Sequence, residues 1–166
     1  MKRYALWAAA AGVAAVLVAP SSAAAPPGSA SILIRHQLRG CHTWSLNGGA
    51  YRAELDVRLA RGGSVTITNN DPMVHKLIRE RGPAVRMRTV PHAHMKMVGL
   101  HRITGPGVMN HMGAALKVTF LRAGTYRFKT EDLGDYFELK SLGHHNHLML
   151  VVRVSQERRA SGLIES

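Results

Sequence analysis

Residues with soft donor atoms are unusually numerous in this chain of 166 residues. It contains one cysteine, ten histidines and eight methionines, while aromatic residues make up only 5%. Thiolate, imidazole and thioether groups are ligands that suit copper and related transition metals. The composition therefore indicates metal binding as the first chemistry to consider.

The single cysteine, Cys41, cannot form a disulfide within one chain. It lies in the segment GCHTWS, beside His42 and three residues before Trp44. An unpaired thiol in an oxidising compartment is a liability unless it is buried or bound to a metal. Cys41 is therefore a buried apolar residue, a link to a second chain or a metal ligand.

Other metal-binding side chains gather in three places. His75 follows an asparagine-rich turn, and His111 and Met112 directly precede an apolar strand pattern. The segment from Gly82 to Gly113 is rich in methionine and histidine, and three imidazoles lie close together further on, at His144, His145 and His147.

The first 24 residues have the features of a secretory signal peptide. Lys2 and Arg3 precede an apolar run from Tyr4 to Ala19, and small residues follow. We expect cleavage near Ala24, a flexible segment over 25–30, and a periplasmic or secreted protein without stable membrane insertion. An uncleaved anchor is the alternative, because the apolar run is nearly long enough to span a bilayer.

The rest of the chain alternates apolar and polar residues with a period of two, which is typical of strands. The pattern predicts strands at 32–38, 51–59, 64–69, 74–78, 116–121, 126–129 and 148–154, with 116–121 and 126–129 paired as a hairpin. It predicts a domain over 31–155, a Met/His-rich insertion with a short helix near 93–100, and a polar tail over 156–166. Short strands separated by turns favour an all-β, antiparallel sandwich.

The order of these elements resembles the cupredoxin family of small blue copper proteins. The resemblance covers about residues 50–154 and rests on GSVTITNND running into MVHKL, on KVTF and LRAGTYRFKT, and on a last strand after GHHNHLMLVVRV. It implies a Greek-key sandwich in which His75 is the first copper ligand. The family's cysteine position is occupied by Thr130, so the usual thiolate is missing. GCHTWS and HMGA also resemble segments of a small secreted branch of the family.

Strand geometry suggests a replacement for that cysteine. If 32–38 runs parallel to 64–69, as the family resemblance implies, both strands end at one pole, and Cys41 and His42 follow there near His75. His111 and Met112 precede a strand that starts at the same pole. We therefore predict a copper site drawn from Cys41, His42, His75, His111 and Met112. The second histidine is left open among His111, His42 and the group His144, His145 and His147, and Met112 is the expected weak axial ligand.

The predicted function is single-electron transfer by an exported copper protein. The alternatives are a non-redox copper-binding or delivery protein that uses methionine and histidine, and a metal-free sandwich that binds an anionic partner. The sequence has no phosphate loop, nucleophile elbow or HExxH motif, so we do not expect an enzyme. The net charge of +12, with seven basic residues against Glu80 alone between Lys76 and Arg102, favours an acidic redox partner. Few aromatic residues are available to stack on bases, which argues against nucleic acid.

Overall fold

The computed structural model describes residues 26–37, 40–70, 73–91, 104–132 and 148–158, with the backbone alone at 36–37, 40–42, 132 and 157–158. These residues form strands and turns, with no helix among them. The eleven strands are β1 (Ser29–Gln37), β2 (Gly40–Leu46), β3 (Tyr51–Arg52), β4 (Glu54–Arg61), β5 (Ser64–Asn70), β6 (His75–Arg81), β7 (Arg86–Val90), β8 (Val108–Met109), β9 (Ala115–Thr119), β10 (Gly124–Asp132) and β11 (Met149–Arg158).

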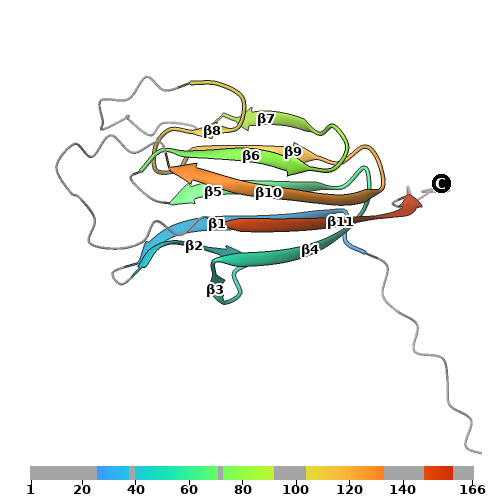
Figure 1. Ribbon diagram of the computed structural model, residues 1–166, viewed down its shortest axis with the longest axis horizontal. Coiled ribbons are helices and arrows are strands. Elements are labelled where there is room, and N and C mark those ends of the chain that lie inside the picture. Colours follow the sequence, from blue (N-terminus) through green and yellow to red (C-terminus); the bar gives the residue numbers. More distant parts are fainter. Residues whose placement is uncertain (1–25, 38–39, 71–72, 92–103, 133–147, 159–166) are drawn as a thin grey trace, which may run out of the picture.

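The strands form two sheets that pack face to face (Figure 1). The first sheet has the order β3-β2-β1-β5-β9-β7 and the second has the order β4-β11-β10-β6-β8. Alternate residues of each strand face inward and fill a shared core, whose largest members are Trp44, Tyr126, Phe120 and Phe128. The all-β sandwich predicted from the period of two is confirmed.

Each sheet contains one parallel pair, so both are mixed rather than wholly antiparallel. In the first sheet β1 runs parallel to β5, with Ile32 opposite Ile67. In the second sheet β4 runs parallel to β11, with Val57 opposite Val152. The parallel arrangement on which the predicted site depends is therefore present.

The predicted hairpin between 116–121 and 126–129 is wrong, because the two strands belong to different sheets. β9 pairs with β5 and β7, whereas β10 pairs with β11 and β6. The turn between them crosses the edge of the sandwich. Tyr126 donates its hydroxyl hydrogen to the carbonyl oxygen of Arg122 at 2.6 Å, and its ring meets Phe120 edge-on at 4.9 Å. This arrangement resembles the tyrosine corner of other β-sandwiches.

Other differences concern short or interrupted strands. The stretch predicted as one strand from Tyr51 to Leu59 is divided at Ala53 into β3 and β4, which lie in different sheets. Within the expected insertion after Gly82, β7 pairs with β9 and β8 pairs with β6. The short helix expected near 93–100 lies outside the described residues, as do the signal peptide and most of the polar tail.

A search of the described residues for a helix long and apolar enough to cross a membrane finds none. The described domain is built entirely from strands of at most ten residues. The apolar run from Tyr4 to Ala19 lies outside the described residues, so signal-peptide cleavage stays a prediction.

Candidate metal centre

One end of the sandwich collects most of the predicted metal-binding positions. We call it the His75 pole, and define it by the last residues of β1 and β5 and the first residues of β2, β6, β9 and β11, together with β8 and the 110–114 turn (left in Figure 1). The register places Arg35 of β1 beside Asn70 of β5, and His36 opposite His42 of β2. The backbone that carries Cys41 and His42 therefore lies at the same end as His75.

His75 is the best-defined candidate ligand at this pole. It is the first residue of β6 and its side chain is fully buried. In the antiparallel pair of β6 and β8 it lies directly opposite Met109, which is also fully buried. Directly opposed residues have their Cβ atoms about 5 Å apart on one face of a sheet. The structure thus places an imidazole and a thioether side by side inside the pole.

The side chain of Asn69 fixes the segments around His75. It is completely buried, and its Nδ2 donates to the carbonyl oxygens of Met73 at 2.8 Å and Met109 at 3.3 Å. The Asn69 amide also donates to the carbonyl oxygen of Ala114, and its own carbonyl accepts from the amide of Gly113. One asparagine thereby holds together the turn before His75, β8 and the 110–114 turn. In the sequence Asn69 appears only as part of an asparagine-rich turn, which does not reveal this role.

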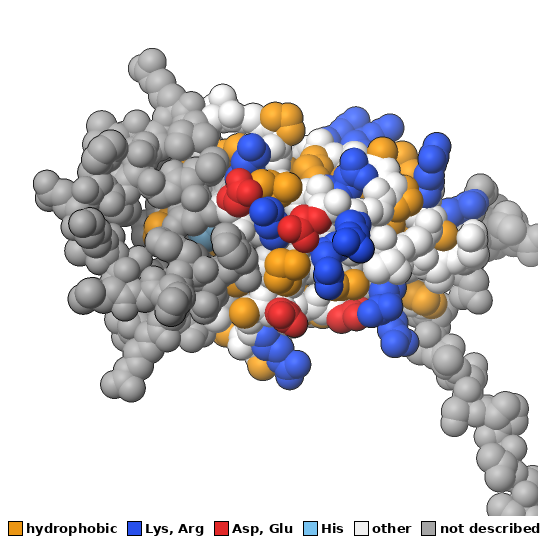
Figure 2. All heavy atoms as spheres, in the orientation of Figure 1, with side chains coloured by type: hydrophobic (Ala, Val, Ile, Leu, Met, Phe, Trp, Pro, Cys, Tyr) orange, Lys and Arg blue, Asp and Glu red, His pale blue; other side chains and the backbone are white. Residues whose placement is uncertain are grey.

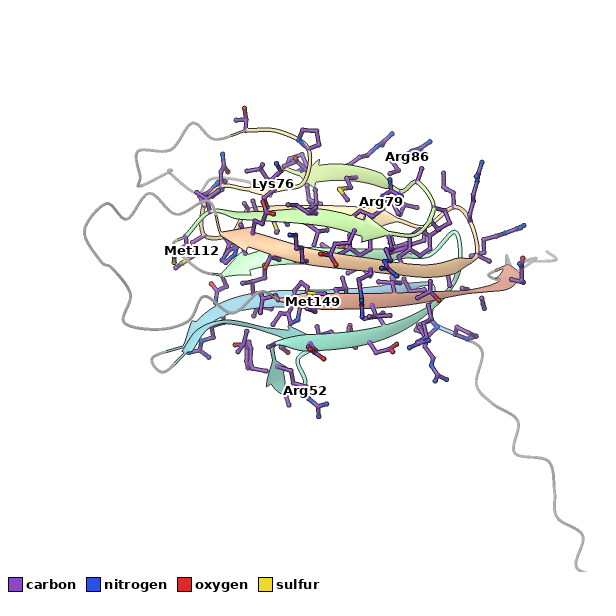
Figure 3. The ribbon with its side chains drawn as sticks, viewed as in Figure 1. Arg52, Lys76, Arg79, Arg86, Met112 and Met149 are labelled. Atoms are coloured by element: carbon purple, nitrogen blue, oxygen red, sulfur yellow. The ribbon has the colours of Figure 1, made fainter. Side chains whose placement is uncertain are left out.

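His111 and Met112 lie in the 110–114 turn, whose hydrogen bonds with Asn69 attach it to the His75 pole. His111 is half-buried, and its Nδ1 lies 2.7 Å from Oδ1 of Asn110. A proton on Nδ1 would be donated to that oxygen and would leave Nε2 available to a metal, which is the usual arrangement of ligating histidines. Met112 has 42% of its surface exposed and lies at the end of the molecule (Figure 3). Met109, rather than Met112, is the methionine that the fold places beside His75.

Thr130 occupies the position that the resemblance gave to the missing copper cysteine. It lies on β10 opposite Leu77 of β6, two residues from the His75 pair, and only 4% of its surface is exposed. Its amide donates to the carbonyl oxygen of Leu148 at 3.0 Å. Residue 130 of β10 therefore lies close to the His75 pair, but it is a threonine and offers a hydroxyl and a methyl group instead of a thiolate.

The structure does not describe the side chains of the remaining predicted ligands. Cys41 and His42 are described by their backbone alone, and His144, His145 and His147 lie outside the described residues, as do His92 and His94. Within the part of the chain that is described, no three His, Cys, Asp or Glu side chains gather in a way that could hold a metal. Trp44, three residues after Cys41 on β2, is fully buried in the core.

Charges near the pole are balanced. On the outer face of the second sheet Lys76 lies opposite Glu131, and Lys129 lies 3.3 Å from Glu131 and 3.9 Å from Glu80. These contacts compensate the positive charge at this end of the sheet.

Comparisons with known proteins do not assign the chain to a family. No family model matches it, and no curated protein matches it. Similar solved structures include a purple cupredoxin from Nitrosopumilus maritimus (17% identity, 75% of this chain and 98% of that chain, TM-score 0.36) and an inclusion body protein from Burkholderia cenocepacia (14%, 83% and 99%, 0.35). A multicopper oxidase from Pediococcus acidilactici is also similar, at 11% identity over 88% of this chain and 29% of that chain, with a TM-score of 0.35. At TM-scores this low, none of these similarities shows which family the chain belongs to.

Proposed function

We propose that this chain binds one copper ion at the His75 pole and carries single electrons. The observation that supports the proposal most directly is the parallel pairing of β1 with β5. It brings the end of β1 and the start of β2, where Cys41 lies, to the same end of the sandwich as the buried imidazole of His75. An unpaired cysteine and a buried histidine at one pole are the two donors on which a copper–thiolate site depends.

In this proposal Cys41 and His75 are the principal ligands. His111 is the favoured second histidine, because its contact with Asn110 leaves Nε2 free to bind. His42 is the alternative within the described backbone. The soft ligand is Met109 or Met112, and the fold favours Met109 because it lies opposite His75. Copper would supply the one-electron redox chemistry, and the residues supply the rigid frame.

Rigidity is the second requirement of an electron carrier, and the surroundings of His75 meet it. The hydrogen bonds of Asn69 join three separate segments, and β6 is paired on both sides, with β10 and with β8. A ligand held from several directions moves little when the charge of the metal changes. Rigid elements also set geometry more accurately than free loops do.

Copper titration of the purified apo protein tests the proposal. We expect one equivalent of Cu(II) to bind with a thiolate-to-copper absorption band, and both Cys41→Ser and His75→Ala to abolish that band. Because thiolate and imidazole must lose protons to bind, affinity should weaken as the pH is lowered. An unchanged spectrum and stoichiometry in Cys41→Ser would refute the thiolate site.

Substitutions of single methionines, with a matched control, test which methionine binds the metal. Met109→Leu should keep copper bound but shift the reduction potential or the absorption band, because a thioether tunes a site more than it holds the metal. Met87→Leu changes another half-buried methionine, on β7 opposite Val118, and should leave both unchanged. A shift in Met112→Leu alone would assign the ligand to the exposed methionine instead.

The same titration separates the two alternative functions. Met109 and Met112 both lie at the pole, and thioethers favour Cu(I). Tight Cu(I) binding without a coloured Cu(II) complex would therefore indicate a non-redox binding or delivery protein. If neither Cu(I) nor Cu(II) binds, the result would favour the metal-free sandwich that binds an anionic partner.

A further inference from the structure

The outer face of the second sheet changes in character along its strands. Near the His75 pole its charges are mixed, as described above. Toward the opposite end four neighbouring strands each carry an arginine, in two directly opposed pairs that are offset from each other by two residues. We call this set the arginine row: Arg58 on β4, Arg153 on β11, Arg127 on β10 and Arg81 on β6. In Figure 2 the acidic side chains end before the right-hand end, where Lys and Arg side chains continue.

The pairing within the arginine row is unfavourable for the isolated protein. Arg81 lies directly opposite Arg127, and Arg153 lies directly opposite Arg58. Like charges that are directly opposed on one face destabilise a sheet. Asp56 compensates one member of the row, through a 2.9 Å contact with Arg153. In the described part of the chain Arg58, Arg81 and Arg127 have no ion pair.

The excess of positive charge continues around this end of the sandwich. On the outer face of the first sheet Arg88 of β7 lies opposite Lys117 of β9, and both are exposed. Arg86 and Arg122 are exposed at the same end (Arg86 is labelled in Figure 3), and so is 53% of the side chain of Leu121. These repeated like-charge pairs concentrate positive charge at this end of the sandwich.

We propose that the arginine row docks the domain on the surface of an anionic phospholipid bilayer. Guanidinium groups bind phosphate oxygens through paired hydrogen bonds, and this row contains arginine alone. Four strands at about 4.8 Å spacing extend the row over roughly 14 Å, so it can contact several headgroups at once. The row lies on the outer face of the sheet, where the apolar residue directly opposite one of its members, Val151 opposite Arg127, is half-buried. A protein partner would instead need an apolar centre to its interface.

The described chain also begins at this end of the sandwich. The carbonyl oxygens of Pro27 and Gly28, just before β1, accept hydrogen bonds from the amides of Ala60 and Ser64. Ala60 follows Arg58 by two residues, so the start of β1 and the arginine row share one end of the molecule.

Vesicle co-sedimentation of the full chain tests the proposal. We compare vesicles of phosphatidylcholine alone with vesicles that contain about one third phosphatidylglycerol, in low and in high salt. The full chain should prefer the anionic vesicles, and salt should abolish the preference. A variant with Arg81→Gln and Arg127→Gln should bind them roughly 25-fold more weakly, since each basic residue near such a surface contributes about fivefold. Arg58→Gln with Arg127→Gln should show the same loss.

The matched control is Lys76→Gln with Lys129→Gln, which removes the same charge from the other end of the same face. It should keep most of the binding, within about threefold. Melting temperatures in low salt give a second readout: the Arg81 and Arg127 variant should be as stable as the unmodified chain or more stable, because a repulsive pair is removed. Equal losses in both variants would overturn the proposal in favour of net charge alone. The proposal would also be overturned if the full chain showed no preference for anionic vesicles. The same holds if it bound a polyglutamate peptide more tightly than the vesicles and that binding depended on the arginine row.

Discussion

Removal of the Asn69 side chain should separate the stability of the His75 pole from that of the rest of the sandwich. In Asn69→Ala, Nδ2 no longer donates to the carbonyl oxygens of Met73 and Met109. The first hydrogen bond, at 2.8 Å, has ideal length, whereas the second, at 3.3 Å, is long and contributes less. The backbone hydrogen bonds of residue 69 do not depend on its side chain and should persist.

The expected cost follows from these contacts. A net intramolecular hydrogen bond contributes about 0.5–1.5 kcal/mol, so the two together account for roughly 1.5 kcal/mol. The fully buried site adds the cost of a small cavity and of a carbonyl at Met109 that loses a donor. We therefore expect Asn69→Ala to lower the free energy of unfolding by about 2–4 kcal/mol. Copper affinity should fall as well, because His75 and Met109 lose their common support.

Urea unfolding of the apo protein measures the first effect, with Asn70→Ala as the control. Asn70 is the next residue of the same strand but is exposed. Its substitution should change stability by less than about 0.5 kcal/mol. Equal midpoints for the two variants would refute the role that we assign to Asn69. A loss of stability in Asn69→Ala without any change in copper affinity would mean that the metal binds elsewhere.

Two further predictions concern stability and its pH dependence. In thermal unfolding, Gly107→Ala should lower stability more than Gly48→Ala. Both glycines have positive φ (80° and 75°), but a Cβ at residue 107 would lie 2.5 Å from the carbonyl oxygen of Leu77, whereas a Cβ at residue 48 would have no atom within 4 Å. Equal costs would show that backbone strain alone matters. Burial raises the pKa of Tyr126 above its usual value near 10, so its contribution to stability is present below about pH 10 and is lost as the pH rises toward the folded-state pKa. Tyr126→Phe should cost about 1 kcal/mol at neutral pH, through the lost hydrogen bond to Arg122, and should show a shallower loss of stability in alkali; an unchanged alkaline slope would contradict this.

The strands that the sequence predicted best are those with one buried face and one exposed face. In β4 and β5 buried and exposed residues alternate nearly without exception, because one face of each strand fills the core. That pattern is visible in the sequence and defines β5 to within one residue and the end of β4 to within two. The two-residue strands β3 and β8 are too short to show any period. They form because neighbouring strands offer them hydrogen-bond partners.

Sheet membership could not be predicted, because alternation gives the face of a strand and not its neighbours. The Leu121–Gly124 turn has the composition of a hairpin turn, and both flanking strands point large side chains inward. The same pattern arises when the chain crosses from one sheet to the other, as it does here. The discriminating signal is Tyr126, since a buried tyrosine four residues after a carbonyl that it can reach is typical of a sandwich corner. The sequence analysis did not use it.

The candidate site shows the same limit. His75 was identified from its turn and is buried as a ligand candidate should be. Met112 was chosen because it precedes a strand, yet it is exposed, whereas Met109 lies opposite His75. Which of two methionines three residues apart points inward depends on the register of β8 against β6. That register is set by hydrogen bonds between segments more than thirty residues apart in the sequence.

The pairing of the strands also decides which charged residues lie next to one another. The sequence showed a basic run from Lys76 to Arg102, but the structure divides it: Lys76 lies opposite Glu131, whereas Arg81 lies opposite Arg127. The arginine row also draws on Arg58 and Arg153, which lie far outside that run. A one-residue shift of β10 against β6 would separate Arg81 from Arg127 and turn one of them toward the core, where an unpaired guanidinium is too costly to bury. Core packing therefore fixes a register that places positive charges side by side. The repulsion that results is tolerated at one end of the sheet face, whereas nearer the His75 pole the same pairing sets Lys76 opposite Glu131.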